Sequence, residues 1–452
     1  MSIFKKILYI LGNYKNKLPF ISMLLLFNSI LDVVGISFLP IIISFLINDQ
    51  NNKLIILTYV FEFNFSDLLG VFCVFLIIFF IVKSIISYYI QKKILSYAYS
   101  VRISIVSKII NNYNKISFEK LFSKKTSDLI LNSITHVGVF TDGVLIPVAR
   151  SISELFVLIG LFILISLQDV KVMLLLLLIV MSIFVLYFLV IKTKLYIYGK
   201  IMSLTEGEII KNLANLIDGF RELKLLNKII YFTQDIEKNL NKYSKSGIKS
   251  RSLQLIPRYL FEVSIITFVL VLIYLSLTYN YMSNDKLITL LGFFVIASIR
   301  IIPSINLISL SISTVRSSAY AIEKICVDIE EIKENEIQND NINNQNKVFS
   351  FSRLNFENVT FKYKNSKNFV LKDINFELNF GEIIGIYGKS GSGKSTFIDL
   401  LLGLLKPSTG DIEIFSTNDN SINTKYDRVR TWQNQISYLP QKTFLIDDSV
   451  YK

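Results

Sequence analysis

The chain has 452 residues, of which 52% are hydrophobic and 18% are charged, and its formal net charge is +13. A mean hydropathy of +0.49 excludes an ordinary soluble protein of this length and predicts a membrane protein with a polar appendage. The positive charge is compatible with a nucleic-acid partner, but the lysines gather between apolar segments, as the positive-inside rule requires of cytoplasmic loops. We therefore expect no nucleic acid among the partners.

Six apolar segments are each long enough to cross a bilayer as a helix of ~20 residues. They lie at about residues 18–47, 68–90, 144–167, 172–191, 259–279 and 287–310. Basic residues load the N-terminus and the long, helix-like second-to-third and fourth-to-fifth connections, whereas the other connections are short and poor in lysine. This alternation predicts a multi-pass protein of the cytoplasmic (inner) membrane with both termini in the cytoplasm.

The pattern changes after the last span, where an amphipathic helix over residues 311–334 is expected to lead into a polar, asparagine-rich linker. Short alternating segments then predict strands at 354–363, 370–380, 382–387, 411–415 and 435–439, with an apolar helix at 396–405. These patterns divide the chain into a six-span helical domain, a linker and a mixed α/β domain. The boundaries are 1–330, 331–348 and 349–452.

A glycine-rich loop stands between a predicted strand and a predicted helix and fits the pattern G-x-x-x-x-G-K-[ST]. Its residues are Gly388, Lys389, Ser390, Gly391, Ser392, Gly393, Lys394, Ser395 and Thr396. Glycines let backbone N–H groups converge on phosphate oxygens, while Lys394 reaches the β and γ phosphates of ATP and the Ser395 hydroxyl ligates Mg²⁺. The alternative is a glycine turn between a core strand and a core helix. A nucleoside triphosphate site is favoured because every fixed position of the pattern is present.

Six spans followed by a phosphate-loop domain resemble an ABC exporter half-transporter. The segment 359–363 (VTFKY) resembles the family's adenine-stacking segment, which assigns Tyr363 to the purine ring. The segment 438–441 (YLPQ) resembles its Q-loop, which assigns Gln441 a catalytic role beside Mg²⁺ or the attacking water. Without the resemblance, Tyr363 would be a core aromatic and Gln441 a solvated side chain. The implied fold is multi-domain: an all-α six-helix transmembrane domain plus a truncated α/β P-loop NTPase domain.

The helical domain carries the resemblance too. Residues 116–120 and 127–129, and residues 218–224, resemble the two cytoplasmic coupling helices of the family. Residues 256–260 and 300–304 resemble bacterial flippases of lipid-linked oligosaccharides. The resemblance implies a homodimer, or a pair with a second half-transporter, that moves an amphipathic lipid-linked saccharide through the lipid bilayer. A lipid A, peptide or multidrug exporter is the alternative.

Charged side chains within spans are costly and usually mark a cavity or a partner. At ~1.5 Å of rise per residue, Lys83, Arg258 and Arg300 all fall on the cytoplasmic side of a ~30 Å core. Together these cations are candidates to hold the pyrophosphate of a lipid-linked glycan. Alternatively, Lys83 and Arg258 snorkel to the interface, or Arg258 pairs with Glu262 one turn on. Asp32, in the first span, is expected to pair with a cation of another span.

The α/β domain is shorter than the resemblance requires. No L-S-G-G-Q signature, no apolar strand ending in an Asp-Glu pair and no switch histidine follow Gln441. The domain is therefore expected to be truncated after the Q-loop, and this chain alone is expected neither to hydrolyse ATP at useful rates nor to transport. It would then be a fragment, a split or frameshifted product, half of a two-chain system, or a non-catalytic remnant that only binds nucleotide.

Overall fold

The computed structural model describes residues 3–47, 53–56, 59–62, 65–122, 124–279, 284–339, 350–363, 366, 368–416 and 432–440. The chain forms two compact units. The first, called here the helical unit, comprises Met1–Ile110 and Thr126–Glu330. The second, called the sheet unit, comprises Asn111–Lys125 and Glu331–Lys452. A short segment from the first half of the chain thus belongs to the same unit as its C-terminal part.

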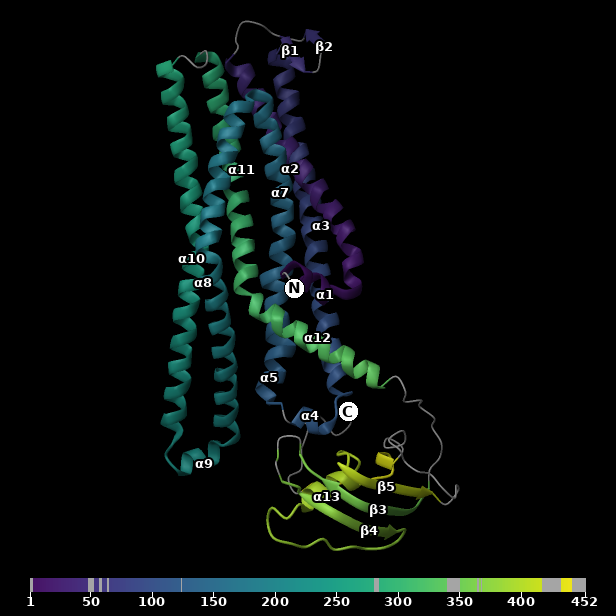
Figure 1. Ribbon diagram of the computed structural model, residues 1–452. Helices are drawn as coiled ribbons and strands as arrows, with labels where there is room; N and C mark the ends of the chain where they lie inside the picture. The colour runs from purple at the N-terminus through teal and green to yellow at the C-terminus, as the bar shows by residue number, and fades with distance from the viewer. Residues whose placement is uncertain are drawn as a thin grey trace. The chain divides into compact units, whose positions relative to one another are not determined.

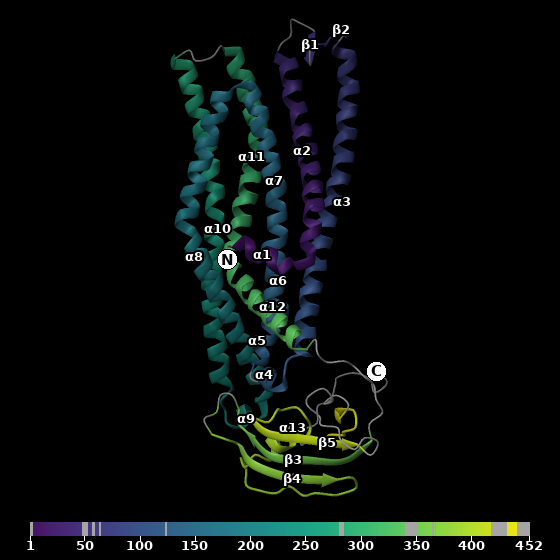
Figure 2. The same ribbon diagram turned by 45° about the vertical axis from the view of Figure 1, so that its right-hand side comes forward.

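The helical unit is built from long helices that run side by side (Figures 1 and 2). In chain order its helices are α1 (Ile3–Leu11), the 3₁₀ helix η1 (Gly12–Lys17), α2 (Leu18–Ile47), α3 (Phe65–Tyr113), α5 (Thr126–Ile130), α6 (Val137–Phe140), α7 (Ile146–Gln168), α8 (Val170–Asp218), α9 (Phe220–Leu225), α10 (Ile229–Tyr279), α11 (Asn284–Ser317) and α12 (Ala319–Asn339). Two π-helical turns, η2 (Leu131–His136) and η3 (Thr141–Leu145), join α5, α6 and α7. The strands β1 (Lys53–Ile56) and β2 (Tyr59–Glu62) form an antiparallel hairpin between α2 and α3.

Within the described part of the chain, six helices are long and apolar enough to cross a membrane. They comprise Ile3–Phe38, Cys73–Tyr113, Thr126–Leu167, Val170–Asp218, Ile229–Ser276 and Ala297–Ser317. This confirms the six predicted spans and a multi-pass membrane protein. At 1.5 Å per residue, α8 and α10 are each ~75 Å long, so both continue far beyond a ~30 Å hydrocarbon core. This agrees with the long, helix-like connection predicted between the fourth and fifth spans.

The core of the helical unit lies where α7, α8, α10 and α11 meet. Leu161, Phe261, Ala297 and Ile301 are almost fully buried there. Apolar side chains on the outer faces, Leu186 among them, stay exposed, as expected of helices whose neighbour is lipid. The very short turn predicted between the third and fourth spans is present. Asp169 forms it and caps α8 by accepting hydrogen bonds from the backbone N–H groups of Lys171 (2.9 Å) and Val172 (3.3 Å).

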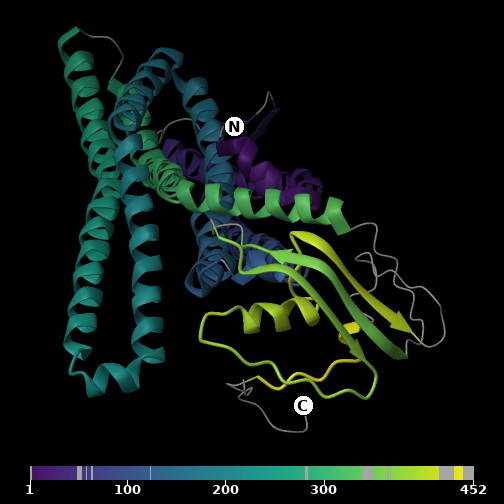
Figure 3. The same ribbon diagram turned by 60° about the horizontal axis from the view of Figure 1, so that its bottom comes forward.

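In the described part of the sheet unit, three antiparallel strands in the order β4-β3-β5 form a sheet, and the helix α13 packs on it (Figure 3). The strands are β3 (Phe351–Phe361), β4 (Leu371–Asn379) and β5 (Thr409–Ser416), and the helix is α13 (Lys394–Leu401). Phe397 of α13 packs on Phe356 of β3 with ring centroids 5.1 Å apart. Phe118 of the short helix α4 (Phe118–Phe122) packs against the same core.

A β-bulge near Asn358 changes which residues of β3 face the core. Leu354 and Phe356 point inward before it, and Val359 and Phe361 after it, so the inward set changes from even to odd numbers. Asn358 has a positive φ of 47°, and the register of β3 shifts against both neighbouring strands at this point. Gly410 permits the bulge, because a Cβ there would lie only 2.3 Å from the carbonyl oxygen of Asn358.

Two predicted strands are wrong. Residues 382–387 run without strand pairing, and their apolar side chains are exposed, with Ile383 at 99% and Tyr387 at 97%. Residues 435–439 also form no strand. A buried strand needs hydrogen-bonding neighbours, and among the described residues none pairs with either segment. The apolar pattern of 382–387 suits a central strand of a larger sheet, but the strands that would flank it are absent from the described part of the sheet unit.

Candidate functional site

The glycine loop takes the backbone conformation that a phosphate cradle requires. Gly391 (φ 81°) and Gly393 (φ 90°) both occupy the left-handed region, and Gly393 is the N-cap residue of α13. A Cβ on Gly391 would meet nothing within 4 Å, so the loop is open on that side. The first N–H groups of a helix have no partner within it and form a natural site for an anion. The loop therefore presents unpaired donors at the start of α13.

Lys394 supplies one of the two positive charges of this loop, the other being that of Lys389. The Nζ of Lys394 donates hydrogen bonds of 2.8 Å to the carbonyl oxygens of Gly388 and Lys389, so the ammonium group folds back over the loop. These two contacts are with exposed backbone and can be exchanged for contacts with phosphate oxygens. The Ser395 hydroxyl on the next residue is exposed as well. The open glycine backbone, the Lys394 ammonium group and the exposed Ser395 hydroxyl fit a triphosphate with Mg²⁺.

Tyr363 lies beside the loop although it follows β3 in the sequence. Its hydroxyl is 3.2 Å from Thr396 Oγ1 in the first turn of α13, and its ring packs edge-to-face on Phe361. The ring remains 36% exposed, so it is not the fully buried core aromatic of the alternative interpretation. Its role at a purine ring stays a prediction. Gln441 lies outside the described residues, and its assignment stays a prediction too.

Of the first predicted coupling region, residues 116–120 lead into α4 within the sheet unit, whereas residues 127–129 lie in α5 of the helical unit. Besides the contact of Phe118 with the core, Lys120 and Lys124 form ion pairs with Glu331 at 3.0 and 2.6 Å. Burial raises the pKa of Glu331, but the hydrogen bonds and charges of Lys124 and Lys120 outweigh it, and the pKa lies below its usual value. Glu331 belongs to α12, which continues to Asn339 and thus into the predicted linker. The second predicted coupling segment, residues 218–224, overlaps α9.

In the helical unit, two of the three predicted intramembrane cations meet at one acid. The Asp32 carboxylate of α2 lies 2.7 Å from Lys83 Nζ of α3 and 2.8 Å from Arg300 Nη2 of α11. Glu154 of α7 is 3.4 Å from Arg300 and accepts a 2.6 Å hydrogen bond from Ser304. The expectation that Asp32 pairs with another span therefore agrees with the structure.

These four ionised residues, Asp32, Lys83, Glu154 and Arg300, are called here the charge cluster. Two positive and two negative charges balance within it, and both carboxylate side chains are only 12% exposed. Glu154 and Ser304 were not singled out from the sequence. The available signal was an acid within the third apolar span, which is as costly as a cation there.

Arg258 does not join the charge cluster. Its side chain is exposed on α10, and so is that of Glu262; within the described ranges the two form no ion pair. The sequence thus grouped three cations, of which the structure brings two together and leaves the third apart. Whether any of them contacts a transported molecule stays a prediction.

The comparisons with known proteins concern the C-terminal part of the chain. Residues 371–452 match the protein family described as ABC transporter. The ATP-dependent lipid A-core flippase of Coxiella burnetii is 38% identical over 95 residues, which cover 21% of this chain and 15% of that protein. A probable ABC transporter ATP-binding/permease protein of Haemophilus influenzae is 34% identical over 99 residues, which cover 22% and 17%. The aligned stretches thus span less than a fifth of these relatives' own lengths.

Proposed function

We propose that this chain uses ATP to move an amphipathic lipid-linked saccharide across the cytoplasmic membrane. An ABC transporter domain follows six helices able to cross a membrane, and this is the composition of an ABC exporter half-transporter. The observation that carries the ATP-driven part is the phosphate loop. There, two positive-φ glycines and the Lys394 ammonium group stand at the start of α13. Both chain ends are assigned to the cytoplasm by the distribution of basic residues.

The roles of the site residues follow from their positions. The backbone of Gly388 to Gly393 and the Lys394 ammonium group hold the phosphates, the Ser395 hydroxyl ligates Mg²⁺, and Tyr363 stacks on the purine. The bound nucleotide supplies the free energy of hydrolysis. Gln441 is assigned the contact with Mg²⁺ or the attacking water by its place in the Y-L-P-Q segment.

Transport by alternating access needs two such chains, either two copies or this chain with a second half-transporter. The coupling segments around α4 and α9 are assigned the transmission of nucleotide-driven closure to the spans. The packing of Phe118 against the core of the sheet unit supports this role for α4, because movement of that core would move the helix with it.

The charge cluster supports a cargo that carries phosphate, but it changes how the cations would bind that phosphate. Arg300 and Lys83 both contact Asp32, so a pyrophosphate must displace Asp32 before it gains both cations. Binding of an anionic headgroup would thereby loosen the link between α2 and α11. An alternating-access transporter requires such a link between the binding of its cargo and the breaking of a contact between helices.

The test is ATP-dependent flipping of a fluorescent lipid-linked oligosaccharide in proteoliposomes that contain the purified chain, with and without a second half-transporter, followed by quenching of the label that reaches the outside. Lys394→Ala serves as the nucleotide control. Flipping that requires both ATP and Lys394 supports the proposal.

Two other results favour the alternatives. Movement of lipid A, a peptide or a neutral drug in place of the saccharide favours another exporter, and the name of the Coxiella burnetii relative makes lipid A the first to try. ATP binding without any transport or ATP turnover favours a remnant that only binds nucleotide.

A further inference from the structure

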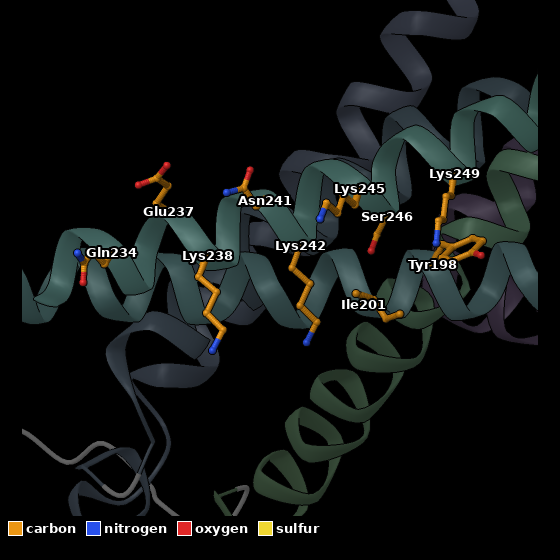
Figure 4. A pocket seen from close by; sticks show the side chains of 10 residues that line it. All are labelled: Tyr198, Ile201, Gln234, Glu237, Lys238, Asn241, Lys242, Lys245, Ser246 and Lys249. Atoms are coloured by element: carbon orange, nitrogen blue, oxygen red, sulfur yellow. The ribbon is translucent and has the colours of Figure 1, made fainter.

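A groove of about 640 Å³ runs between α8 and α10 in the part of these helices that extends beyond the spans (Figure 4). Four lysines of α10 line it, joined by polar side chains and by Tyr198 and Ile201 of α8. The four lysines are Lys238, Lys242, Lys245 and Lys249. Glu237 is the one acid among the lining residues. Such a lining has a strong excess of positive charge and selects for an anion.

The lysines form one row rather than a scattered set. At 100° per residue they fall within about 60° of the helix circumference, and they extend over about 16 Å along its axis. Figure 4 shows Lys238 and Lys242 extending from α10 toward α8, whereas Glu237 points to the other side. Lys249 lies over the Tyr198 ring, with its Nζ 5.9 Å from the ring centroid, which is a cation–π contact.

No carboxylate neutralises this row. Within the described part of the chain, none of the four lysines has an ion pair with an acid, and all four are exposed. Lysines three and four residues apart on a helix repel one another, so the row carries an electrostatic cost in the absence of an anion. An anion with several charges along its length removes that cost.

The depth of the groove decides between a lipid headgroup and a soluble anion. Counted from Val170 at the start of α8, Tyr198 lies ~42 Å along the helix axis, which is ~12 Å beyond a ~30 Å hydrocarbon core. A headgroup layer adds only ~5–8 Å on each side of that core. Lys249, counted from Tyr279, lies ~45 Å along α10, and Lys238 lies still farther out. The row therefore begins past the reach of the headgroups.

We propose that the groove between α8 and α10 is a binding site for a soluble anion that carries several phosphate groups. The site belongs to the helical unit alone and is separate from the phosphate loop. Its ligand contacts the row of lysines through charge-assisted hydrogen bonds, and Ser246 and Asn241 offer additional polar groups along the same groove.

The test measures binding of tripolyphosphate by calorimetry to the full chain in phosphatidylcholine nanodiscs, in Mg²⁺-free buffer. Every arm carries Lys394→Ala, so that the phosphate loop does not hold the probe. The groove variant replaces Lys238, Lys242 and Lys245 by Gln. The matched control replaces Lys92, Lys93 and Lys228 by Gln, because these lysines are exposed and lie outside the groove. Both variants lower the net charge equally.

We expect the groove variant to bind tripolyphosphate at least about tenfold more weakly than the parent. The affinity of the control variant is expected to stay within about twofold of the parent's. Equal weakening in both variants means that only the net charge of the chain attracts the probe, and it overturns the proposal, as does a parent that does not bind. A second arm adds phosphatidylglycerol to the nanodiscs. If this lipid weakens probe binding in the parent but not in the groove variant, a lipid headgroup occupies the groove, and the assignment to a soluble anion is wrong.

Discussion

The Arg300 guanidinium of α11 lies 2.8 Å from the Asp32 carboxylate of α2, although 268 residues separate them in the sequence. Lys83 of α3 contacts the other oxygen of the same carboxylate at 2.7 Å. One acid thus ties together three helices. In a low-dielectric interior, the cost of desolvating both charges can cancel the attraction between them, so the complete pair adds little net stability. Removal of one partner is nevertheless costly, because it leaves an uncompensated buried charge.

The first prediction concerns Asp32. Replacement by Asn leaves Lys83 without its acid and Arg300 with Glu154 alone, and we expect a loss of about 3–5 kcal/mol of stability, seen as a lower Tm in thermal unfolding of the detergent-solubilised protein. The double variant Asp32→Asn with Lys83→Met restores electrical balance, because Arg300 and Glu154 remain as a pair. It is expected to recover a large part of the loss. A double variant as unstable as the single one would show that charge balance is not what stabilises the cluster.

The second prediction separates Arg300 from Arg258 in transport. Arg300 lies in the charge cluster, whereas Arg258 stands apart and exposed. In the proteoliposome assay with a second half-transporter present, Arg300→Ala is expected to lower glycolipid flipping by at least about tenfold while ATP turnover persists, because a charged contact to phosphate is worth about 1.5–3 kcal/mol. Arg258→Ala is expected to have a smaller effect. Normal flipping by Arg300→Ala would mean that the charge cluster does not bind the transported lipid.

The third prediction concerns Lys394. Its two hydrogen bonds to loop carbonyls are replaced by bonds to phosphate when a nucleotide binds, so Lys394→Ala is expected to weaken binding of a fluorescent ATP analogue by roughly 10–100-fold. Lys389→Ala is the matched control, since this exposed lysine of the same loop occupies a variable position of the pattern. Equal losses in both variants would point to general attraction by positive charge.

The fourth prediction tests the bulge in β3. Gly410→Ala is expected to destabilise the pairing of β3 with β5 by about 1–3 kcal/mol, because the new Cβ meets the Asn358 carbonyl and the backbone has a φ of 83°. Gly381→Ala is the control, with a similar φ of 86° and open space around it. Hydrogen exchange of β3 and β5 measures both. A difference of zero between the two variants would mean that the close contact with the bulge costs nothing.

The fifth prediction is a pH dependence. The pKa of Glu331 is lower than its usual value, so the stabilisation from its contacts with Lys120 and Lys124 is fully present above the ordinary Glu pKa of ~4.3 and is lost as pH falls through the depressed value. At neutral pH, Glu331→Gln is expected to speed hydrogen exchange in residues 118–124 roughly fivefold, which corresponds to about 1 kcal/mol. Equal exchange in variant and parent at neutral pH would contradict a stabilising role.

The spans were predictable because length and hydropathy alone decide whether a helix can cross a membrane. The position of the glycine loop at the start of α13 was predictable because its glycines and Lys394 follow a fixed spacing, and its phosphate-binding role stays a prediction. The pairing of Asp32 was also expected, but its two partners were not, because contacts between distant spans depend on packing that a periodic pattern does not contain. Glu154 was overlooked although an acid within the third apolar span is itself a sequence signal.

The strands were harder to predict. Residues 382–387 have a strand-like pattern but lack pairing neighbours among the described residues, so local propensity was not sufficient. The bulge near Asn358 was also missed, although the spacing of three residues between Phe356 and Val359 interrupts the apolar alternation of β3. Tyr363 lies just beyond the end of β3, and the strand pattern did not predict that its hydroxyl lies 3.2 Å from Thr396 Oγ1.

Trp432 gives the sheet unit a spectroscopic signal of its own. It is the single tryptophan of the chain, its Nε1 donates to the Leu401 carbonyl at 2.8 Å, and its ring packs on Phe351 with centroids 5.2 Å apart. All tryptophan emission therefore originates beside the C-terminal end of α13, whose other end carries the phosphate loop. A red shift during denaturation reports unfolding of this unit whatever the membrane helices do, and a change on addition of nucleotide reports a response of α13 without any attached label.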